Sequence, residues 1–116
     1  MNKYLGDWKC REDLENDFKA KIRDDVNVIV ACYDLGHYSG QAIVLYKQND
    51  KLFLVTASHC SCYGLEGQWN GGKYGFDLEY EIDDDFLRHR VKNKIWMWDD
   101  EKHNEEISKI VEEYLG

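Results

Sequence analysis

The 116-residue sequence contains no proline. Proline is enriched in stiff linkers and in many disordered segments, so its absence argues against both in this chain. Hydrophobic residues make up 43% of the sequence and aromatic residues 14%, which is enough apolar material for a packed core. No internal repeat is visible. These features predict one domain that spans residues 1–116.

Long hydrophobic runs are also missing. No window approaches the length of a membrane span, and the first residues contain no apolar run typical of a signal peptide. We therefore expect a cytosolic protein that does not enter a membrane. In that compartment the four cysteines, Cys10, Cys32, Cys60 and Cys62, are expected to stay as thiols or to bind metal, because reducing conditions disfavour disulfides.

Basic residues are outnumbered, with 15 Lys/Arg against 23 Asp/Glu. The excess lies in residues 74–116, where 13 acidic residues face 6 basic ones, whereas residues 1–73 carry 10 and 9. Binding to nucleic acid depends on cations that displace counterions from phosphates. The charge therefore argues against direct nucleic-acid binding and favours a partner with a basic surface.

The first half of the chain predicts one helix and then a strand. Asp7 is the expected N-cap of a helix that runs to about Arg23, with an i, i+4 apolar stripe formed by Cys10, Leu14, Phe18 and Ile22. Residues 26–33 are rich in β-branched side chains and predict a central strand. Simple alternation would place Val26, Val28, Val30 and Cys32 on one face, and Ile29 and Ala31 on the other.

Three more strands are predicted. Residues 41–46 and 52–57 flank Asn49-Asp50, which suits a hairpin turn, and both strands are apolar on both faces. In residues 74–82, apolar and acidic side chains alternate, so a strand with one buried and one acidic face is expected there. Each face of the resulting sheet needs a cover.

Two helices are predicted near the C-terminus. Asp83 can cap a short helix, and Asp100 can cap a longer one with an apolar stripe at Ile107, Ile110, Val111, Tyr114 and Leu115. The whole order predicts an α+β domain, in which an antiparallel sheet of about four strands packs against N-terminal and C-terminal helices. Parallel βαβ units are disfavoured, because no helix is expected between the first strands.

Residues 58–69, SHCSCYGLEGQW, concentrate residue types that carry chemistry. His59, Cys60 and Cys62 could bind zinc, although C-x-C is tighter than the usual half-site. A fourth ligand would have to come from Cys32, Cys10 or His37. Without zinc, no cofactor is expected.

The same stretch has two other interpretations. A thiol enzyme or small-ligand binder would use Cys60 or Cys62 with His59 or His37 as the base, but no orienting Asn or Asp is evident in an acidic setting. Alternatively, Gly64 and Gly67 permit positive φ and a tight return onto the sheet. Tyr63, Leu65 and Trp69 would then pack against the strands.

The SHCSCYGLEGQW stretch, the hairpin sequence GQAIVLYKQNDKLFLVTA before it and the LRHR segment after it resemble a family of small proteins encoded by tailed bacteriophages and prophages. The resemblance covers about residues 26–90. Segment 70–85 departs from it, because family members commonly pass from GQW through a short acidic segment into the helix. The family has no established enzymatic activity, so the resemblance implies a non-enzymatic accessory protein of the host cytosol.

Small acidic phage proteins of this kind often bind and inhibit a host protein. The resemblance therefore implies a nucleic-acid-handling defence factor as the partner, as for anti-CRISPR or anti-restriction proteins. The candidate contact is an acidic row that could occupy a basic groove by mimicking a nucleic-acid backbone: Asp77, Glu79, Glu81, Asp83, Asp84 and Asp85. The alternative for this row is a solvated, highly soluble face.

Trp96 and Trp98 are further candidates for partner contact, because tryptophan is enriched at binding hot spots. Their alternative role is in the core. A small basic patch precedes them and could pair with Asp99-Asp100 or with a second copy of the chain in a homodimer: Arg88, His89, Arg90, Lys92 and Lys94.

Overall fold

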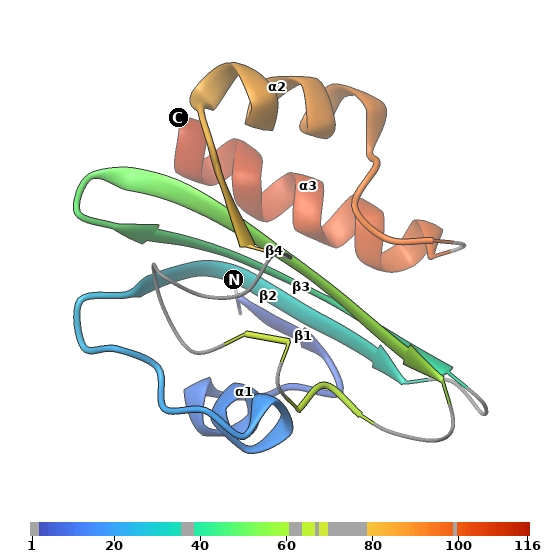
Figure 1. Ribbon diagram of the computed structural model, residues 1–116. Coiled ribbons are helices and arrows are strands. Elements are labelled where there is room, and N and C mark those ends of the chain that lie inside the picture. The colour runs from blue at the N-terminus through green and yellow to red at the C-terminus, as the bar shows by residue number, and fades with distance from the viewer. Residues whose placement is uncertain (1–2, 36–38, 61–63, 67, 70–78, 99) are drawn as a thin grey trace.

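Five strands and three helices make up the part of the chain that the computed structural model describes, which is residues 3–35, 39–60, 64–66, 68–69, 79–98 and 100–116 (Figure 1). The strands are β1 (Tyr4–Gly6), β2 (Asn27–Leu35), β3 (Ser39–Gln48), β4 (Lys51–Cys60) and β5 (Glu79–Ile82). The helices are α1 (Arg11–Phe18), α2 (Asp84–Asn93) and α3 (Glu101–Leu115). The predicted α+β class is confirmed.

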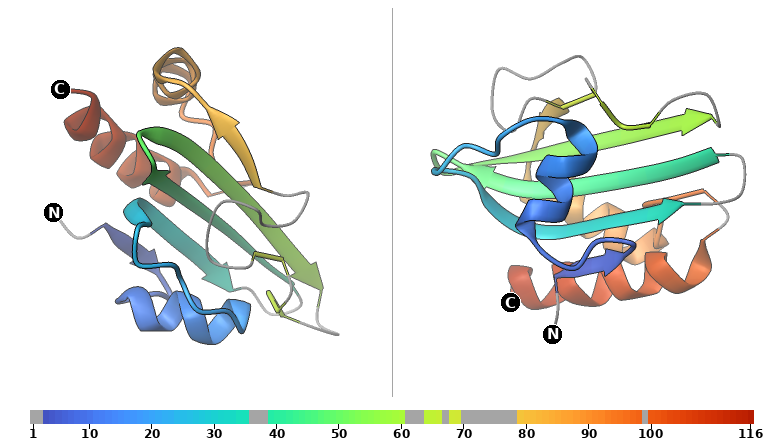
Figure 2. Two further views of the ribbon diagram at one scale, coloured as in Figure 1. Left: turned by 60° about the vertical axis from the view of Figure 1, so that its left-hand side comes forward. Right: turned by 90° about the horizontal axis from the view of Figure 1, so that it is seen from below.

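All five strands belong to one sheet in the order β1-β2-β3-β4-β5. Every neighbouring pair is antiparallel except β1 and β2, which are parallel. Helix α1 lies on one face of the sheet, and α2 and α3 lie on the other (Figures 1 and 2). No helix in the described residues is long and apolar enough to cross a membrane.

The N-terminal prediction is wrong in two respects. The helix covers only Arg11–Phe18, with Cys10 as its N-cap, and it ends where Lys19 adopts a left-handed backbone with φ of 55°. Asp7 caps no helix; its carboxylate accepts a hydrogen bond of 2.9 Å from the backbone N–H of Leu35. Strand β1 is too short for a period-2 signal, so the parallel β1-α1-β2 unit was not expected.

A β-bulge in β2 also changes the predicted faces. The pairing with β3 shifts register between Val28 and Val30, which leaves Ile29 as the extra residue. Val26 and Val28 therefore pack on the α1 side together with the residues after the bulge, Ala31 and Tyr33. The other face carries Ile29, Val30 and Cys32. Simple alternation along this strand was wrong because it allowed no bulge.

Strand β3 needs cover on both faces. Ala42, Val44 and Tyr46 pack in the core beneath α1, whereas Ile43 and Leu45 pack in the core beneath α2 and α3. The predicted hairpin that joins β3 to β4 is confirmed. Asn49 and Asp50 both adopt positive φ, 54° and 62°, which suits a two-residue turn of the primed type.

The predicted return after β4 is present in the residues that the structure describes there. Leu65 and Trp69 are each 1% exposed and join the core on the α1 side. The side-chain amide of Gln68 accepts from the backbone N–H of Ser58 (3.1 Å) and donates to its carbonyl (2.8 Å). Gly64 is exposed, and Tyr63 and Gly67 lie outside the described residues, so the expected backbone conformation at the glycines stays a prediction.

The two predicted C-terminal helices and their caps are present in the structure, but Tyr114 of the predicted apolar stripe is 37% exposed. The carboxylate of Asp83 accepts a hydrogen bond of 2.8 Å from the N–H of Phe86 and caps α2. Asp100 caps α3 in the same way through the N–H of His103 (3.1 Å). The expected strand at 74–82 is observed only as β5, because residues 70–78 lie outside the described part of the chain.

The return segment should behave as a core element. Trp69 packs edge-on against Phe18, with ring centroids 5.5 Å apart, and tilted against Tyr46, with ring centroids 5.3 Å apart. We expect Trp69→Ala to lower the free energy of unfolding by about 3–5 kcal/mol, because it leaves a cavity in the core. Glu66→Ala, at an exposed position of the same segment, should change it by less than about 0.5 kcal/mol. Urea titration followed by circular dichroism measures both, and equal effects would contradict the assigned core role.

Candidate functional site

Most of the described acidic row surrounds one hollow, which we call the acidic hollow. It has a volume of about 410 Å³ and lies where the β3–β4 turn meets the junction between β5 and α2. Its carboxylates come from Asp50, Glu81, Asp83, Asp84 and Asp85. Asp50 was not predicted, because it is 31 residues from Glu81 in sequence and only the β4–β5 pairing brings the turn close.

The acidic hollow is only partly neutralised. The Lys51 ammonium lies 3.8 Å from the Glu81 carboxylate, and the Arg88 guanidinium lies 4.0 Å from the Asp85 carboxylate. These pairs are exposed, so each contributes little to stability. Asp83 is occupied as the cap of α2, whereas Asp84 stands exposed in the first turn of that helix. The surface remains strongly negative.

Two members of the predicted row are not placed by the structure. Asp77 lies outside the described residues. Glu79 begins β5 and pairs with Val55, but its side chain is outside the described part. The described row therefore extends from Glu81 to Asp85.

The two candidate tryptophans have different environments. Trp96 is 6% exposed, and its indole N–H donates a hydrogen bond of 2.9 Å to the Ser108 hydroxyl. Its prediction as a partner-contacting residue is therefore corrected, because the ring is part of the core beneath α2 and α3. Trp98 is 85% exposed. It follows the C-terminal end of α2, whereas the acidic hollow lies at the N-terminal end, so the two do not form one surface.

Side-chain amides hold the segment around Trp98. The amide of Gln41 donates to the carbonyl of Trp98 (2.6 Å) and accepts from its N–H (2.8 Å). The amide of Asn104 does the same for Met97, at 2.9 Å and 2.7 Å. Because both backbone groups of each residue are satisfied, this connector is fixed against the sheet and α3 although it belongs to neither.

His59, from the predicted zinc site, lies against Tyr33 and Gly40. Its Nε2 is 2.6 Å from the Tyr33 hydroxyl, and the ring crosses Gly40, where a built Cβ would approach Nε2 to 2.4 Å. Position 40 therefore has to be glycine for this contact. The side chain of Cys60 and all of Cys62 lie outside the described residues, as does His37. The predicted zinc site stays a prediction.

The other two cysteines have different environments. Cys10 is exposed at the start of α1, whereas Cys32 is buried in the core beneath α3. Burial, followed by the negative charge of Asp100 and Asp34, raises the pKa of the Cys32 thiol well above its ordinary value. Cys32 is therefore unsuited to act as a nucleophile, because the reactive form is the thiolate.

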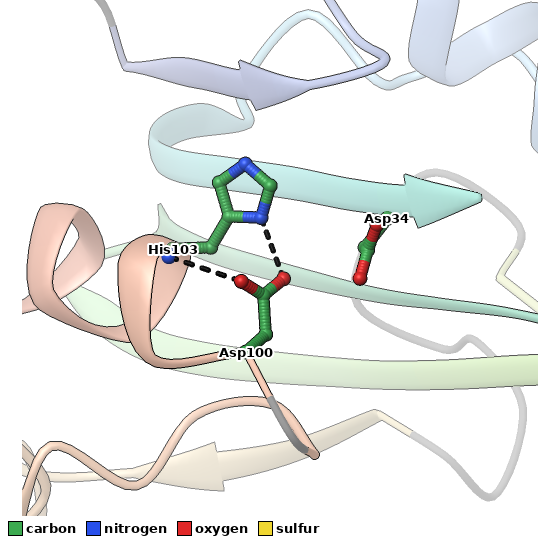
Figure 3. Close-up of side chains that lie close together, drawn as sticks. All are labelled: Asp34, Asp100 and His103. Carbon is green, nitrogen blue, oxygen red and sulfur yellow. Dashed lines mark hydrogen bonds and ion pairs between the residues drawn. The ribbon is translucent and has the colours of Figure 1, made fainter. Parts of the chain in front are cut away.

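A further cluster lies at the end of β2, and we call it the Asp34 cluster. It consists of Asp34, Asp100 and His103, whose ligand atoms all lie within 4.8 Å of one another. Figure 3 shows the Asp34 carboxylate turned toward that of Asp100, while Nδ1 of His103 faces the Asp100 carboxylate from the first turn of α3. Nδ1 lies 2.5 Å from Oδ2 of Asp100. The β2 bulge matters here, because Asp34 follows Cys32 by two residues and so shares its face.

Electrostatic repulsion is part of this cluster. Partial burial raises the pKa of the Asp34 carboxyl, the nearby Asp100 carboxylate raises it further, and His103 partly offsets the rise. Sequence reasoning missed the cluster because Asp34 is 66 residues from Asp100. The one available signal was the D-x-x-H spacing at the start of α3, which places the two side chains of Asp100 and His103 on the same side of a helix.

The predicted basic patch does not pair with Asp100, whose partner is His103. Lys94 instead lies 3.4 Å from Glu105 of α3. Arg90 donates to the carbonyl of Ile95 at 2.8 Å and stacks over Phe86. Asp99 lies outside the described residues. Within the described part of the chain, these contacts of the patch are therefore mostly local to α2 and its C-terminal end, and the Lys94–Glu105 pair links that end to α3.

Comparisons of the chain with protein-family models, curated proteins and solved structures find no match. The resemblance of residues 26–90 to tailed-phage proteins therefore stays a prediction from the sequence. The candidate sites rest on the geometry above.

Asp34→Asn should stabilise the protein at neutral pH. Because folding raises the pKa of Asp34, the wild-type free energy of unfolding falls as the pH rises from the ordinary value of 3.8 through the higher folded value, and it stays lower above that value. The asparagine does not titrate, so the variant should gain about 0.5 kcal/mol over the same window. Urea titrations between pH 3 and 8 in chelator-containing buffer test this. A variant that is less stable at pH 7 would contradict it.

Proposed function

We propose that this chain is a non-enzymatic inhibitor that binds a basic protein surface through the acidic hollow. The observation that carries the proposal is the convergence of five carboxylates around one hollow, which Lys51 lines as the only cation among the residues that the structure describes. An arginine or lysine of a partner can enter such a hollow and be attracted by several carboxylates at once. The chain's net charge of −8 adds attraction at longer range.

The partner that best fits this surface is a protein with a groove for nucleic acid. Such grooves present rows of Arg and Lys that release counterions when a polyanion binds. Glu81, Asp84 and Asp85 offer exposed negative charge in a short array, so the hollow would act as a local plug in the groove. Trp98, at the other end of α2, is outside this contact.

The sequence resemblance gives the proposal its biological setting. A phage accessory protein would act in the cytoplasm of the host bacterium, against a defence factor that handles nucleic acid, such as a CRISPR effector or a restriction enzyme. Direct binding to nucleic acid is not part of the proposal, because the hollow and a phosphate backbone carry the same sign of charge. The proposed complex contains the chain and the host protein.

A pair of charge-reversal variants tests the proposed contact. Glu81→Lys combined with Asp85→Lys places two cations at the acidic hollow and spares Asp83, whose loss would weaken α2. We expect this variant to lose at least 90% of the partner that the tagged wild type captures from bacterial lysate, measured by quantitative mass spectrometry. Double-stranded DNA should also release the partner from the wild type, because both would occupy the same groove.

The matched control combines Asp24→Lys with Glu66→Lys, two exposed positions outside the hollow that change the net charge by the same amount. It should retain the partner. Equal loss in both variants would mean that net charge alone drives capture and would refute the hollow as the contact. Capture that is unchanged in both variants would refute an electrostatic contact altogether. Circular dichroism and thermal melts confirm that each variant is folded.

A further inference from the structure

We propose that the Asp34 cluster is a binding site for a divalent transition-metal ion, with Asp34, Asp100 and His103 as its protein ligands. The site is separate from the acidic hollow and does not depend on the proposed inhibitory function. It also differs from the zinc site predicted at His59, Cys60 and Cys62, because its donors are two carboxylates and one imidazole.

The ligands come from two elements that the fold holds rigidly. Asp34 lies near the end of β2, between Tyr33 and Leu35, and Asp7 holds both neighbours. The N–H of Asp7 donates to the carbonyl of Tyr33 (2.8 Å), and its carboxylate accepts from the N–H of Leu35 (2.9 Å). Asp100 and His103 belong to the capped first turn of α3. Rigid elements that present converging donors favour binding, because little conformational entropy is lost when the ion enters.

The charges of the cluster are not balanced by other side chains. Among the described residues, no lysine or arginine forms an ion pair with Asp34 or Asp100, and His103 is the only basic partner of Asp100. The side chains of Asp100 and His103 are only 10% and 17% exposed. Two carboxylates that face one another in a partly buried position repel, and a divalent cation between them would reverse that interaction.

An opening beside Asp34 gives the ion access. Asp34 lines a hollow of about 390 Å³ together with Ser39, Gln41, Ser58, His59 and Trp98. This hollow is large enough for the water molecules that complete the coordination of an ion with three protein ligands. The hydroxyl and amide groups on its wall can hydrogen-bond to such waters. Asp34 therefore connects this opening to Asp100 and His103, the two donors that do not line it.

The donor set favours zinc or manganese. Imidazole nitrogen suits zinc and other transition metals, and carboxylate oxygen is accepted by zinc and manganese alike. Bonds of about 2.1 Å at tetrahedral angles set the ligand atoms about 3.4 Å apart. The ligand atoms of the cluster lie within 4.8 Å of one another, so side-chain rotations that move them by about 1 Å would bring them to this spacing. One rotation must separate Nδ1 of His103 from Oδ2 of Asp100, which are now 2.5 Å apart.

Isothermal titration calorimetry of the full chain with ZnCl₂, and separately with MnCl₂, tests the proposal. The protein is first stripped with a chelator and then exchanged into chelator-free buffer. We expect one ion per chain for at least one of the two metals. Asp34→Asn and His103→Gln should each weaken binding about 10-fold or more, because each removes a donor. Asp34→Asn is the decisive variant, since it is expected to be at least as stable as the wild type.

Three control variants locate the site. Asp84→Asn removes an exposed carboxylate of the acidic hollow, and His89→Gln removes an exposed imidazole of α2. Cys60→Ser combined with Cys62→Ser removes the thiols of the sequence-predicted zinc site. All three should bind as the wild type does. In spectra of ¹⁵N-labelled protein, substoichiometric Mn²⁺ should broaden the amides near Asp34 and His103 before those near Asp84.

Several outcomes would overturn the proposal. Wild-type affinity in Asp34→Asn would show that the cluster does not hold the ion. Loss of binding in the double cysteine variant alone would assign the metal to the His59 segment instead. Loss in Asp84→Asn alone would assign it to the acidic hollow. The absence of saturable binding of either ion below millimolar concentration would exclude a specific site.

Discussion

The structure depends on a sheet whose central strand is apolar on both faces. Val44 and Tyr46 point to one side of β3, and Ile43 and Leu45 point to the other, and all four are buried. Burial of apolar surface is the main favourable term in folding, so each face must be covered. Helix α1 and the return segment cover one face, and α2 and α3 cover the other. The packing of α3 against the second face is also what brings Asp100 and His103 to Asp34.

Side-chain amides form hydrogen bonds with backbone groups that the helices and strands leave without a partner. Gln41, Gln68 and Asn104 each bond to both backbone groups of one residue, at Trp98, Ser58 and Met97 respectively. Each amide therefore acts like one residue of a neighbouring strand. A buried backbone group without a partner costs about 1–3 kcal/mol, and at the part-buried Met97 the amide of Asn104 supplies both partners. Among the described residues, these amides fix Met97 and Trp98 of the connector before α3 and tie Gln68 of the return to Ser58.

The acidic hollow and the Asp34 cluster, which both concentrate negative charge, differ in their exposure to solvent. The carboxylates of the acidic hollow are exposed, so water and salt screen their repulsion and a large partner can reach them. Asp34 and Asp100 are fewer but closer and more enclosed, so their repulsion is stronger for each pair. The first arrangement suits a macromolecular cation, and the second suits a small one. Both lie where the connections between elements meet the ends of strands, as binding sites often do.

Local signals in the sequence determined much of the fold. The turn at Asn49-Asp50, the caps Asp83 and Asp100 and the two-sided apolar strands were all predicted, because each depends on neighbouring residues alone. The short β1 and the length of α1 were not. Of the candidate site, the sequence identified the acidic row around Glu81 but not the contribution of Asp50, which only strand pairing brings near.

Only the tertiary structure decided which side chains converge. The bulge at Ile29 moves every later residue of β2 to the opposite face, so it places Asp34 beneath α3, and no periodicity in the sequence reports it. Trp96 and Trp98 are two residues apart and chemically identical, yet one is buried and one is exposed. Composition and spacing determine which helices, strands and turns form, because capping, turn preference and hydrophobic periodicity depend on residues that are close in sequence. Register and packing determine which residues meet, because those contacts join distant parts of the chain.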